Sequence, residues 1–225
     1  MPHIAERYDA VRRAIADAAD CAGRDPADVL IVAVTKTVGL DEIRQAIAAG
    51  MRDFGENRVQ EFLGKHGLFP DVRWHFIGTL QSNKAKDVVG KAHLIHSVDS
   101  LKLLRVIDRH AEQLGVVQPV LLEVNVAAEE TKHGLAPGDV RDALVEASAC
   151  KNVQVKGLMT MAPFVRPEDV RWVFRELREL RDSLREMPLN GVELDDLSMG
   201  MTNDYRVAVE EGATIVRVGR AIFGK

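Results

Sequence analysis

Short apolar runs alternate with amphipathic segments along almost the whole chain. The runs typical of strands fall at 30–35, 51–55, 73–77, 92–96, 118–126, 153–158, 192–197 and 213–218. Helical patterns lie between them, near 40–49, 56–66, 81–89, 99–114, 137–149, 167–186 and 202–211, and a further helix is expected at 3–22. The pattern therefore predicts eight strand–helix units preceded by an additional N-terminal helix.

Eight such units favour a closed parallel barrel. Each helical crossover returns the chain to the same end of the sheet, so successive strands run parallel. An open doubly wound sheet usually carries a Gly-x-Gly-x-x-Gly motif after its first strand, and this chain has none. Barrels of about 200–250 residues commonly form one domain, so we expect residues 1–225 to be a single (β/α)8 TIM-type barrel.

Composition and charge narrow the class of protein. The chain has 46% hydrophobic and 28% charged residues, as ordinary globular proteins do. Its 30 basic and 34 acidic residues are interspersed, without the basic stripe of a nucleic-acid-binding protein. Cys21 and Cys150 suit neither a disulfide framework nor a metal site, and no apolar run reaches the roughly 18 residues of a membrane span. We expect a cytoplasmic monomer that binds neither nucleic acid nor membranes.

Lys36 is the most reactive side chain expected at the carboxyl ends of the strands, where barrel enzymes and binding proteins place their sites. A lysine at the end of a buried strand lies in low-dielectric surroundings, which disfavour the ammonium form and leave an amine that forms imines. The alternative is a lysine that merely extends to solvent at the rim. Position alone leaves both interpretations open.

Two loops expected on the same rim favour a phosphate ligand. The stretch Ser198–Thr202 follows the seventh strand with two hydroxyls and a glycine, and Gly219-Arg220 follows the eighth. Barrels often bind phosphate with the backbone N–H groups of these two loops. The alternative is that Ser198 and Thr202 only cap a helix. Together with Lys36, the loops point to a phosphorylated aldehyde.

Several charged and titratable residues fall within or beside the apolar runs. Arg217 interrupts the eighth run, and a buried arginine stays charged and needs an acceptor. It would form an ion pair, for instance with Glu123, or face a ligand. His75, His93 and His96 lie in or beside the third and fourth strands, where we expect them to bond to backbone groups. Lys132, in the loop after the fifth strand, is a candidate contact for an anionic ligand.

The chain resembles the pyridoxal phosphate homeostasis proteins, single-domain relatives of the alanine racemase N-terminal barrel. The resemblance covers nearly the whole chain and rests on several motifs in order. They are Val34-Thr35-Lys36; Phe54-Gly55-Glu56-Asn57 with Gln60-Glu61; Trp74-His75-Phe76-Ile77-Gly78 with Gln81-Ser82-Asn83-Lys84; Ser97-Val98-Asp99; Lys132-His133-Gly134-Leu135; Gly157-Leu158-Met159-Thr160-Met161; Leu197-Ser198-Met199-Gly200-Met201; and Val216-Arg217-Val218-Gly219 with Ile222-Phe223-Gly224.

The resemblance implies a vitamin B6 cofactor, pyridoxal 5'-phosphate, and a role for each candidate residue. Lys36 would carry the cofactor as a Schiff base, Asn57 would lie near the ring face, and Arg217 near the pyridine nitrogen. The phosphate would be held by Ser198, Met199, Gly200, Thr202, Gly219 and Arg220. Arg220 departs from the family, where a small hydroxyl residue is more common. A contact through its backbone N–H would survive this change, whereas a side-chain hydroxyl contact would be lost.

Three functions remain to be weighed. The first is a cofactor carrier active in intracellular pyridoxal phosphate homeostasis without robust catalysis, with apo forms of pyridoxal phosphate enzymes as candidate partners. The second is a weak amino-acid racemase, which needs a second base opposite Lys36. In the racemases that the chain resembles, this base is a tyrosine from a separate domain, and here only Tyr8 and Tyr205 exist. The third, a cofactor-free Schiff-base aldolase, leaves the two loops and Arg217 unexplained. We favour the carrier.

Overall fold

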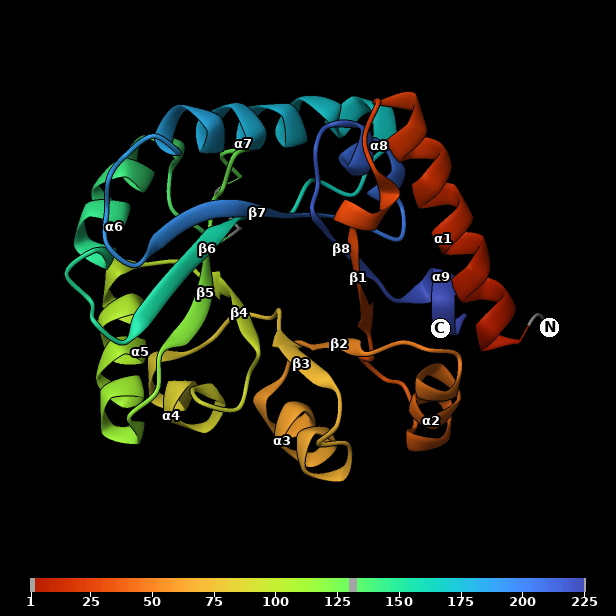
Figure 1. The fold of residues 1–225 in the computed structure, drawn as a ribbon, viewed down its shortest axis with the longest axis horizontal. Helices are drawn as coiled ribbons and strands as arrows, with labels where there is room; N and C mark the ends of the chain where they lie inside the picture. The colour runs from red at the N-terminus through yellow and green to blue at the C-terminus, as the bar shows by residue number, and fades with distance from the viewer. Residues whose placement is uncertain (1–2, 130–132, 225) are drawn as a thin grey trace.

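The computed structural model describes residues 3–129 and 133–224, and its centre is a closed barrel of eight parallel strands. The strands are β1 Leu30–Val34, β2 Asp53–Glu56, β3 Arg73–Phe76, β4 Leu94–Val98, β5 Gln118–Glu123, β6 Val153–Met159, β7 Val192–Met201 and β8 Ile215–Val218. They pair in chain order, and β1 pairs with β8, with Ala33 opposite Val218 (Figure 1). The predicted TIM-type barrel is confirmed.

Helices surround the barrel on its outer side (Figure 1). They are α1 Ile4–Cys21, α2 Leu40–Ala48, α3 Val59–Leu68, α4 Ala85–Val88, α5 Leu101–Leu114, α6 Val140–Ala147, α7 Arg171–Leu184, α8 Tyr205–Glu210 and α9 Arg220–Phe223. Short 3-10 turns lie at Pro26–Asp28, Ser82–Lys84, Pro137–Asp139 and Pro167–Val170. The expected N-terminal helix is present as α1. The pattern did not predict α9, and it ended the seventh strand at 197, whereas β7 continues to Met201.

The helix α5 shows how local sequence sets an element. The Ser100 side chain accepts a hydrogen bond from the backbone N–H of Leu103 and caps the first turn. Gly115 ends the helix with a left-handed backbone, φ 66°, which glycine adopts without strain. Between these ends, one face is buried: Leu103, Leu104, Ile107 and Ala111. This face packs on the barrel because its apolar residues recur at helical spacing.

The apolar core has two parts. The larger part lies between the strands and the surrounding helices and includes the fully buried Phe54, Trp74 and Phe174. A small cluster fills part of the barrel interior and consists of Val32, Leu94, Leu121, Met159 and Ile215. The barrel is therefore packed rather than hollow, as such barrels usually are. The rest of the interior includes buried polar side chains, among them Arg217, which reaches the candidate site.

The N-terminal helix is joined to the last elements of the chain. α1 packs against α8 and α9. Beyond its end, Arg24 donates hydrogen bonds to the carbonyl oxygens of Val209, at 2.6 Å, and Ala213, at 2.9 Å. The first and last parts of the chain therefore lie side by side where β1 and β8 close the barrel (Figure 1).

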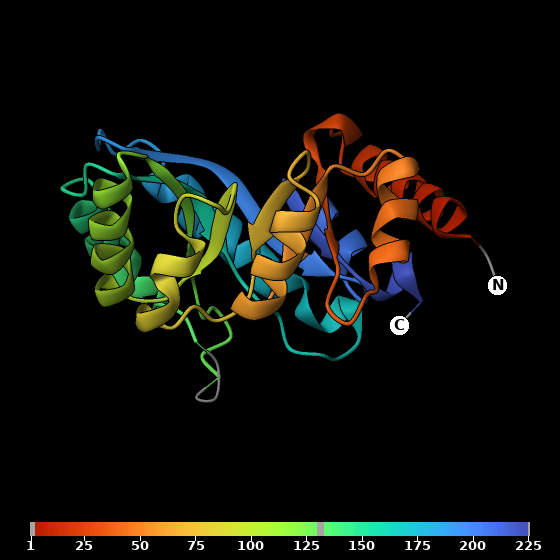
Figure 2. The same ribbon diagram turned by 90° about the horizontal axis from the view of Figure 1, so that it is seen from below.

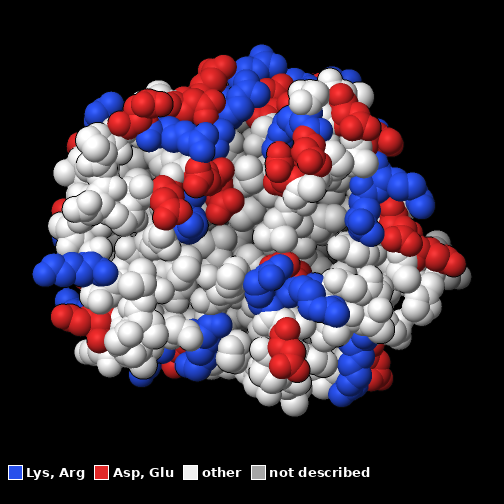
Figure 3. Space-filling model, in the orientation of Figure 1, with Lys and Arg blue, Asp and Glu red and all other residues white. Residues whose placement is uncertain are grey.

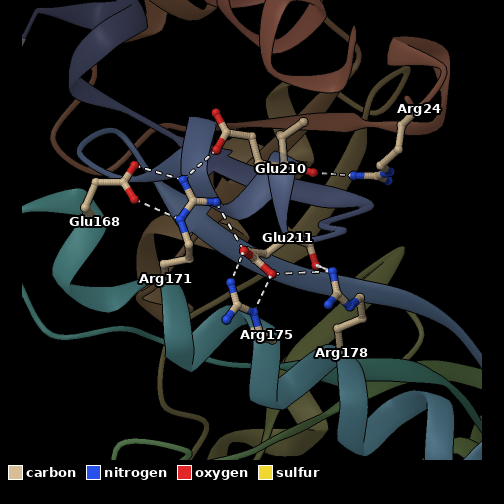
Figure 4. Close-up of polar contacts among 8 residues, drawn as sticks. Arg24, Glu168, Arg171, Arg175, Arg178, Glu210 and Glu211 are labelled. Carbon is tan, nitrogen blue, oxygen red and sulfur yellow. Dashed lines mark hydrogen bonds and ion pairs between the residues drawn. The ribbon is translucent and has the colours of Figure 1, made fainter. Parts of the chain in front are cut away.

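An ion-pair cluster joins α7 to the end of α8 (Figure 4). Glu211, only 6% exposed, pairs with Arg171 at 3.1 Å, Arg175 at 3.0 Å and Arg178 at 3.4 Å. Arg171 also pairs with Glu210 at 2.6 Å. Buried carboxylates need such partners. The cluster fixes α8, which leads directly into β8, and so helps to set the position of the last strand.

The described residues that follow β5, 124–129 and 133–136, and the segment after β6 project from the same side of the molecule (Figure 2). This is the side of the carboxyl ends of the strands, where the polar residues found in the sequence are expected. Lys132, a candidate contact in the first of these loops, lies outside the described residues. None of the helices in the described part of the chain has the length and apolar character of a bilayer span.

Candidate functional site

A cavity of about 760 Å³ opens at the carboxyl ends of the strands. Six of the nine residues predicted to bind the cofactor line it: Lys36, Asn57, Thr202, Arg217, Gly219 and Arg220. They come from the ends of β1 and β2, from the segment after β7, and from β8 and the residues that follow it. The structure therefore brings together most of a site that is spread over the whole sequence.

Lys36 lies directly after β1 at the rim of the cavity. Its side chain is exposed, so the low-dielectric surroundings expected from the sequence are not present. The next residue, Thr37, has a left-handed backbone with φ 62°, which is rare for a β-branched residue. Strained backbone of this kind persists only where the surroundings hold it, and it is common at functional sites.

A buried ion pair supports the end of β1. Lys65 of α3 lies 2.5 Å from the Glu56 carboxylate and donates a second hydrogen bond, 2.9 Å long, to the carbonyl oxygen of Thr35. The Thr35 hydroxyl donates to the same carboxylate oxygen at 2.6 Å. These contacts fix the backbone immediately before Lys36, so its side chain starts from a rigid point.

Asn57 offers an unused polar atom beside the cavity. Its side-chain oxygen Oδ1 is buried and has no hydrogen-bond partner among the described residues. Such atoms are uncommon because a buried polar group without a partner costs free energy. Gly78 packs against the same residue, and a side chain there would place its Cβ 2.2 Å from the Asn57 carbonyl oxygen. Asn57 is thus held in place with one acceptor free for a ligand.

Backbone donors gather in the residues that follow β8, beside the end of β1. The Thr202 hydroxyl oxygen accepts from the N–H groups of Gly219, at 3.3 Å, and Ala221, at 3.5 Å. Arg220 is exposed, and its guanidinium carbon lies 5.6 Å from the centre of the Phe164 ring. Converging backbone N–H groups suit an anion such as phosphate. Residues 219–225 also have the Gly-x4-Gly-Lys spacing of nucleotide-binding loops, but here the helix α9 occupies 220–223.

Ser198, Met199 and Gly200, which the resemblance assigns to the phosphate, do not line the cavity. The reason is that β7 extends to Met201, so all three residues belong to a strand. Ser198 points into the barrel, Met199 is fully buried in the outer core, and Gly200 has φ 91°. A side chain at Gly200 would lie 2.9 Å from the backbone of Tyr205. Glycine at this position thus allows α8 to pack closely against β7.

Arg217 is buried, with 4% exposure, and reaches the cavity from inside the barrel. It donates hydrogen bonds to the Ser198 hydroxyl, at 2.5 Å, and to the Thr160 carbonyl oxygen, at 2.8 Å. Burial lowers the pKa of Arg217 to about 10, against the opposing influence of Glu123 and Asp204. Glu123 therefore affects Arg217 only through its charge, because the hydrogen bonds of Arg217 go to Ser198 and Thr160. At neutral pH the guanidinium is a positive charge in the cavity wall.

The histidines of β3 and β4 bond to side chains rather than to the backbone groups expected. His75 contacts Asp53 and His96, each at 3.0 Å, and His96 contacts Ser198 at 2.8 Å. His93 is exposed and lies against the His75 ring, with ring centres 5.4 Å apart. Within residues 3–129 and 133–224, no three His, Cys, Asp or Glu side chains form a group that could hold a metal ion.

A second cavity, of about 910 Å³, lies at the amino ends of the strands. It is larger than the first and is lined by Asp53, Arg73, His75 and His93 among others. Acidic and basic side chains are interspersed on this face of the molecule, which is turned to the viewer in Figure 3. Its described lining residues include no lysine. Most of the residues predicted to bind the cofactor line the first cavity instead.

Comparison with known proteins agrees with this architecture. Residues 7–225 match the family model described as the N-terminal domain of alanine racemase. A pyridoxal phosphate homeostasis protein of Aquifex aeolicus is 46% identical over 223 residues, covering 98% of this chain and 97% of that protein. The chain belongs to the pyridoxal phosphate homeostasis protein family. Membership in this family accounts for the motif order and for the closed barrel with its N-terminal helix.

Solved structures agree with this membership in the pyridoxal phosphate homeostasis family. PipY of Synechococcus elongatus, described with pyridoxal phosphate bound, is 38% identical, with a TM-score of 0.85 and coverage of 98% of this chain and 100% of PipY. Alanine racemase of Streptomyces coelicolor has a TM-score of 0.73 at 18% identity, and the match covers 98% of this chain and 58% of the racemase. The second likeness shows a shared barrel fold only.

Some residues of the cavity wall could not be found by reasoning about strand ends. Ile77 and Phe164 line the cavity, yet apolar residues carry no chemical signal in a sequence. Phe164 is 73% exposed, which is unusual for a phenylalanine. This exposure can be recognised only once the fold is known. Thr37 also lines the cavity, and nothing in the sequence marks its left-handed backbone.

Proposed function

We propose that this chain binds pyridoxal 5'-phosphate in the cavity at the carboxyl ends of the strands and serves intracellular cofactor homeostasis without robust catalysis of its own. The observation that carries the proposal is the meeting, in one cavity, of the Lys36 amine with Thr202 and the backbone donor at Gly219, next to the backbone donor of Ala221. An amine and a phosphate site are what a phosphorylated aldehyde requires. The names of the relatives and the cofactor bound in PipY support the same ligand.

The residues present fit this cofactor. Lys36 would form a Schiff base, in which its nitrogen bonds to the aldehyde carbon and one water leaves. Thr202, Gly219 and Ala221 would hold the phosphate, and the free acceptor of Asn57 would meet a donor of the ligand. When bound, pyridoxal phosphate supplies an aldehyde for amines and a ring that withdraws electrons.

Arg217 favours a protein that binds the cofactor over one that uses it in catalysis. The guanidinium carries its charge at neutral pH and has no acceptor atom. Beside the pyridine nitrogen it would keep that nitrogen unprotonated, and the ring would then withdraw electrons less strongly. Arg217 therefore supports the proposal of a carrier in which Lys36 acts as a tether.

The tyrosines give no support to a racemase. Such an enzyme needs a second acid or base opposite the lysine. Tyr8 lies at the other end of the barrel, where it lines the cavity at the amino ends, and Tyr205 begins α8 outside the cavity wall. A weak racemase activity remains the alternative, and a chiral assay for D-alanine formation separates it from the carrier.

The wider setting of the protein follows from the same reasoning. We propose that residues 1–225 act as one cofactor-binding domain, as a monomer in the cytoplasm. Apo forms of pyridoxal phosphate enzymes would be its partners, and membranes and nucleic acids would not. Size-exclusion chromatography with light scattering tests the monomer, since a mass near twice 24.9 kDa would contradict it.

The binding proposal is tested by mixing the purified protein with pyridoxal phosphate and recording the visible spectrum. We expect a yellow complex whose absorbance is bleached by borohydride, which reduces the C=N bond and leaves the cofactor attached to Lys36. Lys36→Ala should abolish both the colour and the attachment. Lys86→Ala, which removes an exposed lysine of α4, is the matched control and should behave as the wild type. A colourless wild type would refute the proposal.

The carrier role needs a separate experiment. The loaded protein is incubated with an apo-enzyme that depends on pyridoxal phosphate, with and without an enzyme that destroys free cofactor. Recovery of activity in the presence of this trap would show direct transfer. Recovery only without the trap would mean release into solution, and no recovery at all would contradict a donor function.

A further inference from the structure

A line of buried polar side chains crosses the interior of the barrel. Its members come from β2, β3, β4, β7 and β8, and they are Asp53, His75, His96, Ser198 and Arg217. The successive contacts measure 3.0, 3.0, 2.8 and 2.5 Å. Asp53 and His75 line the cavity at the amino ends, whereas Arg217 lines the cavity with Lys36. The line therefore connects the two ends of the barrel.

The carboxylate at one end sets the direction of the hydrogen bonds. Burial alone would raise the pKa of Asp53, but hydrogen bonds from His75 and Arg73 lower it to about 2, so Asp53 only accepts at neutral pH. His75 must then carry a proton on Nε2. As a neutral ring it accepts at Nδ1, and the donor is Nε2–H of His96. The remaining nitrogen of His96, Nδ1, is left as an acceptor.

The Ser198 hydroxyl completes this arrangement. It donates to Nδ1 of His96, and its oxygen accepts from Nη1 of Arg217. In the opposite arrangement His96 would also donate to Ser198. Among the described hydrogen bonds the serine proton would then have no acceptor, and such a buried donor is costly. Burial, and then the nearby charge of Arg217, hold the pKa of His96 well below its ordinary value, which disfavours a doubly protonated ring.

We propose that Ser198 is a positioning residue for Arg217, and that the two buried histidines hold its hydroxyl in the orientation that accepts from the guanidinium. Arg217 is thereby held at two points, Ser198 and the Thr160 carbonyl oxygen. This inference deepens the proposed function and rests on it in one respect, because the orientation of Arg217 matters to the cofactor only if pyridoxal phosphate binds beside it. It also gives Ser198 a role different from phosphate binding.

The hydrogen-bond directions can be measured without the cofactor. Nitrogen-15 NMR of the histidine rings in the full-length protein at neutral pH distinguishes the two neutral forms from the charged ring. We expect both His75 and His96 to be neutral and protonated on Nε2. A proton on Nδ1 of either ring, or a doubly protonated ring, would overturn the proposal.

Variants then test the effect on the cofactor. Ser198→Ala removes the acceptor of a charged donor, and we expect pyridoxal phosphate to bind on the order of tenfold to a hundredfold more weakly, with a shifted visible absorbance. Asp53→Asn, at the far end of the line, should produce mixed histidine protonation in the NMR spectrum and bind the cofactor roughly fivefold more weakly. Asp196→Asn is the matched control, because this carboxyl group also faces the amino-end cavity but bonds to Thr214.

The outcomes separate the two proposals. If wild-type protein binds no pyridoxal phosphate, the proposed function fails, and the NMR spectrum still decides the hydrogen-bond directions. If the wild type binds the cofactor and Ser198→Ala matches its affinity and spectrum, the positioning role is refuted. An equal effect of Asp53→Asn and Asp196→Asn on cofactor affinity would refute the inference that Asp53 influences Arg217 through the buried hydrogen bonds. Should Ser198→Ala fail to fold, Asp53→Asn and the wild-type NMR spectrum decide.

Discussion

The buried pair of Lys65 and Glu56 permits a quantitative prediction about stability. The Lys65 nitrogen lies 2.5 Å from the carboxylate, and the side chains are 11% and 0% exposed. Lys65→Met would leave the Glu56 carboxylate buried without its cation, and the other carboxylate oxygen, Oε2, already has no partner among the described residues. Removing one member of a buried ion pair costs about 3–5 kcal/mol. For a protein of this size, that loss lowers the melting temperature by roughly 6–20 °C.

Thermal unfolding followed by circular dichroism at pH 7 measures this effect. Lys86→Met is the matched control, since Lys86 is exposed, and we expect a change within about 0.5 kcal/mol. The double variant Glu56→Gln with Lys65→Met leaves no buried charge and should recover much of the loss. If Lys65→Met unfolds at the same temperature as Lys86→Met, the pair does not stabilise the end of β1 as argued here.

Three further predictions follow from single contacts. The pKa of Asp53 is about 2 in place of 3.8, so its ionised form adds on the order of 2 kcal/mol to the free energy of unfolding above pH 4. This contribution is lost as the pH falls towards 2. The stability of Asp53→Asn, measured by urea unfolding, should therefore differ most from that of the wild type at neutral pH and least near pH 2. Glu211→Gln should lower the free energy of unfolding by about 1–3 kcal/mol in calorimetry, because three arginines lose a charged acceptor. Glu176→Gln, at an exposed position, is the control. An equal loss in both variants would contradict a stabilising role of the ion-pair cluster. Gly78→Ala should cost about 1–3 kcal/mol in the same measurement, since the new Cβ would overlap the Asn57 carbonyl oxygen, and an unchanged stability would contradict this close contact.

Periodicity was sufficient to predict the order of elements, because apolar runs of strand length and helical faces alternate without interruption. It could not fix where β7 ends. Ser198 and Gly200 look like loop residues, since serine and glycine favour turns, yet both are buried in a strand. Tertiary contacts outweigh local preference here: Ser198 bonds to His96 and Arg217, and Gly200 allows α8 to approach.

The candidate site was predictable where chemistry is carried by charged or hydrogen-bonding residues at strand ends. Lys36 and Arg217 were found in this way, whereas the role of Asn57 came from the family resemblance, and the structure places all three in one cavity wall. The exposure of Lys36 was not predictable, because it depends on the conformation of the loops around the residue. The partners of the buried histidines were equally hidden, since Asp53, His75 and His96 meet only when neighbouring strands align.

The pairing of β1 with β8 has a consequence for protein synthesis. Lys36 follows the first strand and Gly219 the last, and they become neighbours only when Ala33 aligns with Val218. While the ribosome is still adding residues before β8, the growing polypeptide already displays the reactive lysine but has none of the backbone donors at Gly219 and Ala221. Its amine is then no more selective for a phosphorylated aldehyde than that of any other lysine. If Lys36 binds pyridoxal phosphate as proposed, half-made chains would therefore lack the selective site of the finished protein.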